Sequence, residues 1–274
     1  CRRTMSAAAE MDDDDIMEMG GERSIFQGAL MVRLHAACMI VAWLLLLNLG
    51  SFFARYLKRP PNEAYVWYAY HMWAQVAGSV LAVVGFACVF LHLASNGEEH
   101  FEGKHQGLGG VLLFVMLFQP VLGWMAHRSY VKYGISPSRW HVAHWWLGRA
   151  LALLAALTIG MGIDMFFHHI IHDGADRVRP FFWASYLALL AAAGGTVCFL
   201  EGNRVGKEGA EAAAREQLKA AGEEMADLAA GAAPAAHAAP PPASRAWLNW
   251  WVVGAYAVVA VTCVTPMLYV VLLG

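Results

Sequence analysis

Six runs of apolar residues follow one another along the chain, each bounded by polar or charged segments. They cover residues 34–56, 67–94, 107–126, 145–167, 181–200 and 247–273. Each run is close to or above the roughly 20 residues that a helix needs to cross about 30 Å of hydrocarbon. The runs lack the polar alternation of barrel strands, and backbone polar groups cannot stay unpaired in lipid. The pattern therefore predicts an all-α, multi-pass membrane protein with about six transmembrane helices.

These runs and the segments between them divide the chain into four parts. We expect residues 1–30 to be a flexible acidic extension and residues 31–201 to be a transmembrane domain that holds the first five spans. Residues 202–245 predict a linker of Ala, Pro and charged residues that begins with a surface helix, and residues 246–274 predict an additional transmembrane helix. Because the chain begins with Cys1 and shows no cleavable signal peptide, we expect it to be the tail of a longer precursor.

Composition narrows the class of protein and its partners. Apolar residues make up 59% of the chain and charged residues 15%, a balance that a soluble domain of this size could not keep dissolved. The net charge is near zero, and no stripe of Lys and Arg with interleaved aromatic residues is present, which argues against nucleic acid as a partner. The motif Cys-x-x-Cys-His is absent from the sequence, so any heme would be a non-covalent, b-type heme.

The charges of the loops predict the orientation of the spans. Loops rich in Lys and Arg stay on the cytoplasmic side of a membrane. Positive charge follows the first and third spans, whereas the loop after the second span is acidic. The basic residues are Arg55, Lys58 and Arg59 in one loop and Arg128, Lys132 and Arg139 in the other, and the acidic residues are Glu98, Glu99 and Glu102. We therefore expect an extracytoplasmic N-terminus and a cytoplasmic linker at residues 202–245.

Four of the twelve histidines lie near the ends of the first four spans, at two expected depths. His35 and His105 lie at the outer ends of spans one and three, and His71 and His144 lie at the inner ends of spans two and four. A low-spin b heme needs two axial imidazoles at equal depth on facing helices. We therefore predict two b-type hemes in a four-helix core, one between His35 and His105 and the other between His71 and His144. Helix rise places their irons roughly 15 to 20 Å apart.

Several neighbouring residues have a second interpretation. His141 lies three residues before His144, and His92 lies at the other end of span two from His71, so each is an alternative ligand or an interfacial polar residue. Small residues near the ligands indicate either heme clefts or ordinary helix packing; they are Gly78, Gly85, Gly109 and Gly148. A cluster after span four has the composition of a metal site or of a solvated loop; it consists of His168, His169, His172 and Asp173.

Basic residues flank both predicted heme levels and could contact heme propionates or anionic substrates. At the outer level these are Arg33 and Lys104, and at the inner level they are Arg55, Lys58, Arg59 and Arg149. The inner residues could instead serve only to set the topology, and Arg149 could simply extend toward the membrane surface.

Three stretches carry a resemblance to a known family. Residues 34–58, LHAACMIVAWLLLLNLGSFFARYLK, contain His35 and end in Ala-Arg-Tyr-Leu-Lys. Residues 68–71 bring the second histidine. Residues 104–109, KHQGLG, lead through Phe-Gln-Pro at 118–120 to Trp-x-x-x-His-x-x-x-Gly at 140–148. The chain resembles the cytochrome b561 domain, and in particular the branch often fused to an external DOMON domain, over about residues 34–200.

The resemblance implies a transmembrane oxidoreductase with two b hemes. It implies a cytoplasmic reductant such as ascorbate, an extracytoplasmic acceptor such as monodehydroascorbate or a ferric chelate, and a surrounding lipid bilayer, and it leaves a homodimer open. The sequence departs from the branch in three ways: no DOMON domain precedes the core, Ala36 replaces a usual Gly, and a sixth span follows the linker. An electron-relay subunit of a larger membrane complex and a transporter-like bundle without heme are the alternatives.

Overall fold

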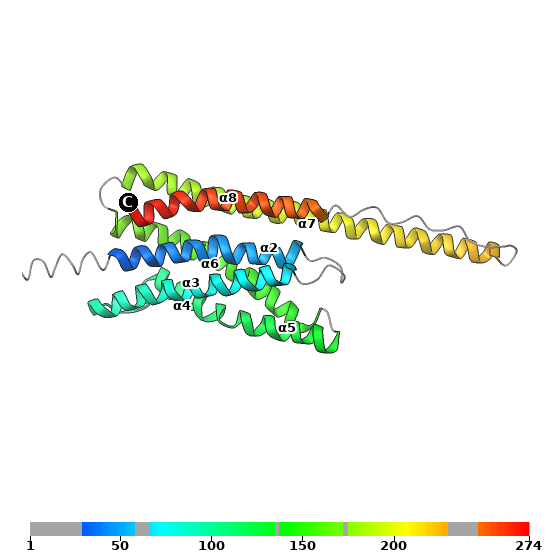
Figure 1. Ribbon diagram of the computed structural model, residues 1–274, viewed down its shortest axis with the longest axis horizontal. Coiled ribbons are helices and arrows are strands. Elements are labelled where there is room, and N and C mark those ends of the chain that lie inside the picture. The colour runs from blue at the N-terminus through cyan, green and yellow to red at the C-terminus, as the bar shows by residue number, and fades with distance from the viewer. Residues whose placement is uncertain (1–28, 58–65, 135–136, 172–174, 230–245, 274) are drawn as a thin grey trace, which may run out of the picture.

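The computed structural model describes residues 29–57, 66–134, 137–171, 175–229 and 246–273 (Figure 1). Within these residues the regular structure is entirely helical. Six helical stretches are long and apolar enough to cross a membrane, namely Ala29–Tyr56, Val66–Asn96, Lys104–Tyr133, Arg139–His168, Asp176–Lys219 and Leu248–Leu273. The predicted all-α, multi-pass fold class is therefore confirmed. Every apolar run of the sequence lies inside one helical stretch, apart from single terminal residues.

The first span changes its helical geometry partway. A regular helix over residues 29–39 passes into the π-helix η1 (Ile40–Leu47) and then into α2 (Asn48–Tyr56). A π-helix bonds each N–H five residues back rather than four. Side chains donate to carbonyls of this segment: the Tyr256 hydroxyl bonds the Leu44 carbonyl at 3.3 Å, and the Gln75 amide bonds the Leu47 carbonyl at 2.9 Å. Neighbouring helices thus stabilise η1 by donating to two of its buried residues' carbonyls.

The third span consists of two helices. The second span is the single helix α3 (Val66–Asn96), whereas the third is divided into α4 (Lys104–Met116) and α5 (Gln119–Tyr133). Pro120 lies at the start of α5, where its missing N–H would have no partner in any case. The break leaves the Phe118 N–H bonded to the Val115 carbonyl at 3.2 Å, three residues back. Proline therefore explains why one predicted run yields two helices.

The remaining helices are α6 (Arg139–His169), α7 (Ala175–Ala229) and α8 (Ala246–Leu273). α7 extends alone beyond the other helices in Figure 1, where its outer half is yellow. The sequence stretch expected as a surface helix at the start of the linker is thus a direct continuation of the fifth span. The rest of the predicted linker, residues 230–245, lies outside the described residues, as does nearly all of the expected N-terminal extension.

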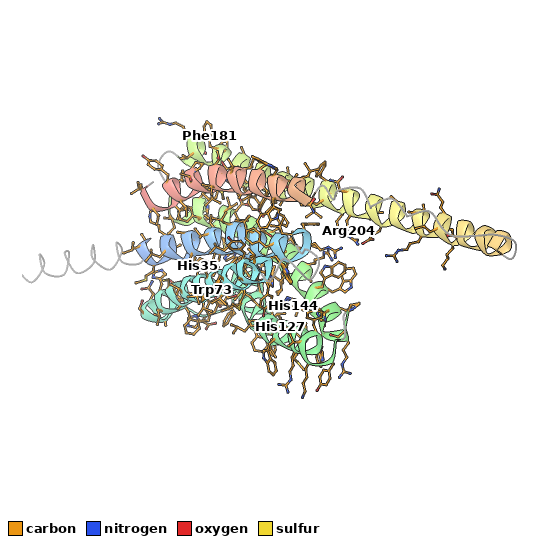
Figure 2. The ribbon with its side chains drawn as sticks, turned by 45° about the vertical axis from the view of Figure 1, so that its right-hand side comes forward. His35, Trp73, His127, His144, Phe181 and Arg204 are labelled. Atoms are coloured by element: carbon orange, nitrogen blue, oxygen red, sulfur yellow. The ribbon has the colours of Figure 1, made fainter. Side chains whose placement is uncertain are left out.

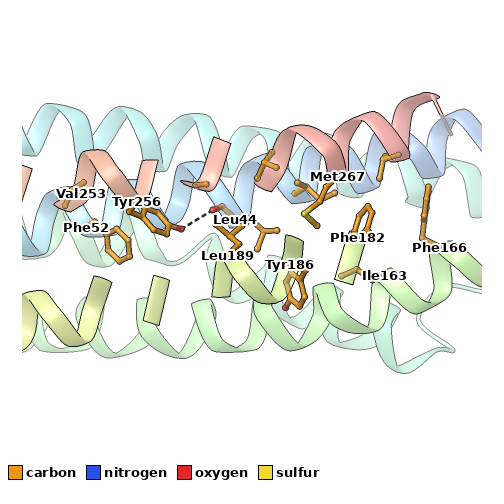
Figure 3. Packing of buried hydrophobic residues seen from close by; sticks show 14 of the residues in the cluster. Leu44, Phe52, Ile163, Phe166, Phe182, Tyr186, Leu189, Val253, Tyr256 and Met267 are labelled. Carbon is orange, nitrogen blue, oxygen red and sulfur yellow. Dashed lines mark hydrogen bonds between the residues drawn. The ribbon is translucent and has the colours of Figure 1, made fainter. Parts of the chain in front are cut away.

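Two groups of buried apolar residues hold the bundle together. One lies where α7 and α8 pack against the first span and the end of α6 (Figure 3). Tyr256 of α8 contacts Phe52 there, with ring centres 4.7 Å apart, beside its bond to Leu44. The other group lies within the first four spans and contains Ala42, Trp43, Leu47, Ala82, Leu112, Met116, Leu151 and Ala155. We call this second group the central apolar layer.

Candidate functional site

His35 and His105 face each other across the first and third spans. His35 belongs to the helix of residues 29–39, and His105 is the second residue of α4. Their ring centres are 6.2 Å apart, and the ring planes are at 89°. The structure thus brings together two histidines that are 70 positions apart in the sequence.

His71 and His144 form a second pair with nearly the same geometry. His71 lies in the first turns of α3 and His144 in the first turns of α6. Their ring centres are also 6.2 Å apart, with the planes at 87°. Figure 2 shows His35 and His144, one from each pair, displaced from each other along the bundle. Both pairs are the combinations that the sequence predicted from depth.

Backbone carbonyls fix the proton of three of the four rings. The Nδ1 atoms bond to carbonyl oxygens at 2.8 or 2.9 Å: His35 to Gly85, His71 to Gly50, and His105 to Thr158. A carbonyl cannot donate, so in each case Nδ1 carries a proton, and in the neutral ring Nε2 is then the nitrogen with the free lone pair. This is the state that a metal-binding imidazole needs, with the other nitrogen oriented by a hydrogen bond. The Nδ1 of His144 is buried and makes no hydrogen bond of this quality to any of the described residues.

The spacing of each pair fits an iron between two imidazoles. Metal–nitrogen bonds of roughly 2 Å, plus roughly 1 Å from each nitrogen to its ring centre, give about 6 Å between ring centres. Both pairs show 6.2 Å. Neutral, half-buried imidazoles on facing helices are the usual donors to a low-spin heme. The residues present therefore fit b-type heme at both levels.

The central apolar layer separates the two pairs. On each of the first four spans its members lie between the histidine and the far end of the same span. All of its side chains are less than 10% exposed, and Trp43 is the largest. Packed apolar side chains exclude water, so we expect the layer between the two histidine levels to be dry.

Of the glycines predicted beside the ligands, two pack against another helix. A Cβ added at Gly78 would lie 2.8 Å from the Leu47 side chain, and one at Gly85 would lie 2.8 Å from the Cβ of Cys38. These positions serve the close approach of α3 to the first span. Added Cβ atoms at Gly109 and Gly148 would meet only ordinary contacts, at 3.9 Å and 3.5 Å.

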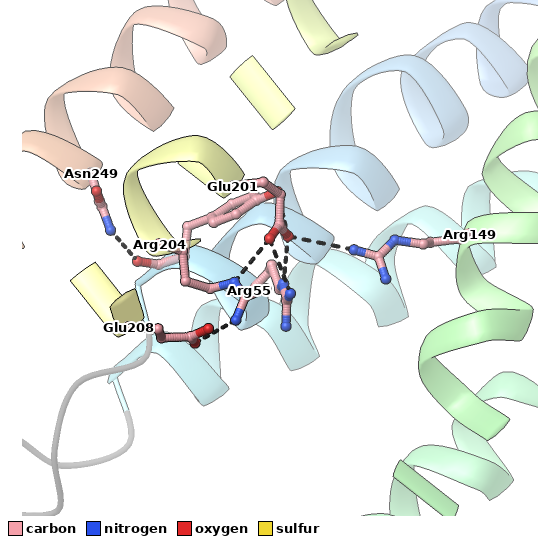
Figure 4. Close-up of polar contacts among 7 residues, drawn as sticks. Arg55, Arg149, Glu201, Arg204, Glu208 and Asn249 are labelled. Atoms are coloured by element: carbon pink, nitrogen blue, oxygen red, sulfur yellow. Dashed lines mark hydrogen bonds and ion pairs between the residues drawn. The ribbon is translucent and has the colours of Figure 1, made fainter. Parts of the chain in front are cut away.

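Arg55 and Arg149 are bound to a carboxylate of the chain itself. Glu201 of α7 accepts from Arg55 Nε at 2.8 Å and lies 3.6 Å from Arg149 Nη2 (Figure 4). Tyr56 donates its hydroxyl to Glu201 at 3.2 Å, and Arg204 donates Nε at 2.9 Å. We call these five residues the Glu201 cluster. It ties α2, α6 and α7 together near the His71–His144 pair.

The other basic residues predicted at the site have different surroundings. Arg33 donates Nη1 to the Val271 carbonyl at 2.9 Å and so binds the C-terminal turn of α8. Lys104 is exposed at the start of α4. Lys58 and Arg59 lie outside the described residues. Arg149 also stacks on Trp145, with its guanidinium carbon 3.5 Å from the ring centre.

The alternative histidines do not join either pair. His141 accepts from the Ser138 backbone N–H at 3.2 Å and contacts the Ser138 hydroxyl at 2.8 Å, closing the first turn of α6. His92 contacts Asn96 on its own helix. His168 is exposed, and His172 and Asp173 lie outside the described residues. Among the residues that are described, no group of three or more His, Cys, Asp or Glu side chains is arranged to hold a metal ion.

Replacing His141 by alanine is expected to spare the visible absorption of the protein. The substitution removes a helix-capping contact and should lower the free energy of unfolding by about 1 kcal/mol. Replacing His144 should instead remove the heme absorption of one site. Reduced-minus-oxidised spectra of the two purified variants make the comparison, and loss of heme in the His141 variant would exchange the two assignments.

Three residues that contribute to the candidate site were not predicted from the sequence. Gly50 and Thr158 bind histidine rings through their backbone carbonyls, and a backbone carbonyl is the same in every residue type. Glu201 had a signal, because it is an acidic residue at the end of an otherwise apolar run. A carboxylate in that position needs basic partners at the same depth.

Comparisons with known proteins locate the chain among its relatives. The family profile described as eukaryotic cytochrome b561 matches residues 34–169. Ferric-chelate reductase 1 of Homo sapiens is 24% identical over 159 residues, which cover 56% of this chain and 25% of that protein. A cytochrome b561 and DOMON domain-containing protein of Arabidopsis thaliana is 28% identical over 167 residues, or 61% of this chain and 37% of that protein. No solved structure matches the chain.

The chain spans between 25% and 37% of the length of these two relatives. The matched segment contains all four facing histidines and excludes α7 and α8. The redox chemistry implied by the match therefore concerns the first four spans.

Proposed function

This chain belongs to the cytochrome b561 family through residues 34–169, and we propose on that premise that it passes electrons across a membrane through two b-type hemes. The facing pairs support this most directly. Two sets of neutral imidazoles, each 6.2 Å between ring centres, occur at opposite ends of one four-helix core. His35 and His105 would hold one heme, and His71 and His144 the other.

Bound heme supplies a one-electron couple at its iron. The chain supplies the position of each iron and a dry path between the two. Gly85 follows His71 by 14 residues on α3, and the Gly85 carbonyl holds His35, so the two levels are roughly 21 Å apart along the helix axis. The central apolar layer fills this interval and excludes water from it. The Nδ1 protons of His35, His71 and His105 stay bound to carbonyls, so these rings need neither gain nor lose a proton as an electron passes.

For substrates we propose ascorbate as the cytoplasmic donor and monodehydroascorbate or a ferric chelate as the extracytoplasmic acceptor. Ascorbate would lose one electron on one side, and Fe³⁺ would become Fe²⁺ on the other. The name of the human relative, a ferric-chelate reductase, supports the second acceptor. The three arginines of the Glu201 cluster carry more positive charge than its one carboxylate neutralises, which suits an anionic donor near the His71–His144 pair. The extracytoplasmic N-terminus predicted from loop charge places that pair at the cytoplasmic face.

The purified protein is expected to contain two hemes per chain. Extracted heme measured against protein tests this number directly. Vesicles that carry the protein and enclose ascorbate should then reduce ferric citrate added outside, and vesicles without the protein should not. One heme per chain would contradict the di-heme core, and a colourless protein from heme-replete cells would end the proposal.

A further inference from the structure

Two of the four ligand rings lie directly against a glycine of the facing helix. A Cβ added at Gly162 of α6 would lie 2.7 Å from Cε1 of His105. A Cβ added at Gly123 of α5 would lie 3.2 Å from Cε1 of His144. In both cases the contact falls on Cε1, which is bonded to both ring nitrogens. Any displacement of this atom therefore moves the nitrogen that would bind iron.

The backbone around Gly162 also holds the His105 ring. Thr158 lies four residues before Gly162, one helical turn away, and its carbonyl accepts from His105 Nδ1 at 2.9 Å. The ring is thus held by the carbonyl at one edge and rests on the bare backbone of α6. A methyl group at position 162 could be accommodated only if the ring moved away from α6.

A regular spacing connects these glycines with the histidines. Each of the first four spans carries a histidine near one end and, 14 to 18 positions later, a glycine that lies beside the histidine of a neighbouring span. For these contacts span one is matched with span two, and span three with span four. The spacings are 15 for His35 to Gly50, 14 for His71 to Gly85, 18 for His105 to Gly123 and 18 for His144 to Gly162. In spans one and two the glycine acts through its carbonyl, and in spans three and four it provides room for the ring.

We infer that Gly162 and Gly123 are positioning residues that set the placement of the His105 and His144 rings and hence of the irons they would bind. The inference rests on the proposed di-heme function. The short distance between an added Cβ and a ligand ring distinguishes these two glycines from Gly160 on α6. Gly160, two residues before Gly162, would bring an added Cβ no closer than 3.7 Å to Trp183.

The test compares Gly162→Ala with Gly160→Ala in the full-length protein. Overpacking at position 162 should cost about half of the bound heme or shift one of two components in a redox titration of the reduced absorption band. The electron paramagnetic resonance signal of that same heme should change, because it depends on the mutual angle of the two imidazole planes. Gly160→Ala should match the unmodified protein in all three measurements. A smaller amount of the variant protein in the membrane would lower the signals of both hemes equally and would not affect one heme selectively.

Gly123→Ala provides a second, milder case, because its contact of 3.2 Å requires a shift of only a few tenths of an ångström. It should perturb the heme of the other pair and retain both hemes. If Gly162→Ala does not accumulate in membranes, Gly123→Ala alone tests whether the glycines position the rings. Unchanged redox titrations and resonance spectra for a folded Gly162→Ala, or for Gly123→Ala in its place, would overturn the inference. The proposed function would still stand in that case if Gly160→Ala holds two hemes. Absence of heme from Gly160→Ala and the unmodified protein alike would overturn both.

Discussion

Replacing His105 by alanine is expected to remove one of the two proposed hemes and to reduce transmembrane electron transfer by at least about 100-fold. Loss of a residue that merely orients a metal ligand already costs 10- to 100-fold, so loss of the ligand itself should cost no less. The His71–His144 pair lies in a different layer and has its own carbonyl contact at Gly50. Its heme should therefore remain.

Heme content and ferric citrate reduction by ascorbate-loaded vesicles measure the two effects. His92→Ala is the matched control, because His92 is an intramembrane histidine that contacts only its own helix through Asn96 among the contacts described. It should keep both hemes and the rate. Retention of both hemes by His105→Ala would contradict the assignment of this pair.

Replacing Glu201 by glutamine is expected to lower the free energy of unfolding, because three arginines share this one carboxylate. Arg55, Arg149 and Arg204 would lose their common carboxylate. Removing one partner of a fully buried ion pair costs about 3 to 5 kcal/mol. The Glu201 side chain is 23% exposed and its partners more so, which reduces the expected loss to about 2 kcal/mol.

Thermal unfolding in detergent compares this variant with Glu208→Gln. Glu208 pairs with Arg204 and is 61% exposed, so its replacement should change stability by less than about 0.5 kcal/mol. Equal melting temperatures for the two variants would show that the Glu201 cluster does not stabilise the packing of α7 on the core.

The fold class and the facing histidines could be predicted because each depends on position along a helix. Apolar length specifies a span, and the distance of a histidine from the end of its span specifies its depth. Depth alone then pairs His35 with His105 and His71 with His144. The rotation of each helix about its axis, which determines which side chains meet, follows from packing and is not visible in hydropathy.

The surroundings of the basic residues could not be predicted for the same reason. Arg55 and Arg149 were candidates for contact with a propionate or a substrate anion, beside the alternatives of setting the topology or extending to the membrane surface. Both contact Glu201, which lies more than 50 positions after Arg149 in the sequence. Arg33 was expected at the other end of the core in the same role and binds the carbonyl of Val271. Charge and depth were informative, but the identity of the partner depended on where α7 and α8 pack.

The π-helix of the first span gives its residue count a meaning beyond length. Gly50, which holds His71, and His35 lie on either side of η1. Deleting one residue from Ile40–Leu47 could convert the segment to an ordinary α-helix, and about seven α-helical residues turn through roughly the same angle as the 8 residues of the wider π-helix η1. Such a chain would keep its hydropathy, its six spans and nearly the same rotation of His35 relative to Gly50. The π-helix thus holds one additional residue in the first span while the helical segments on either side of it keep their mutual orientation.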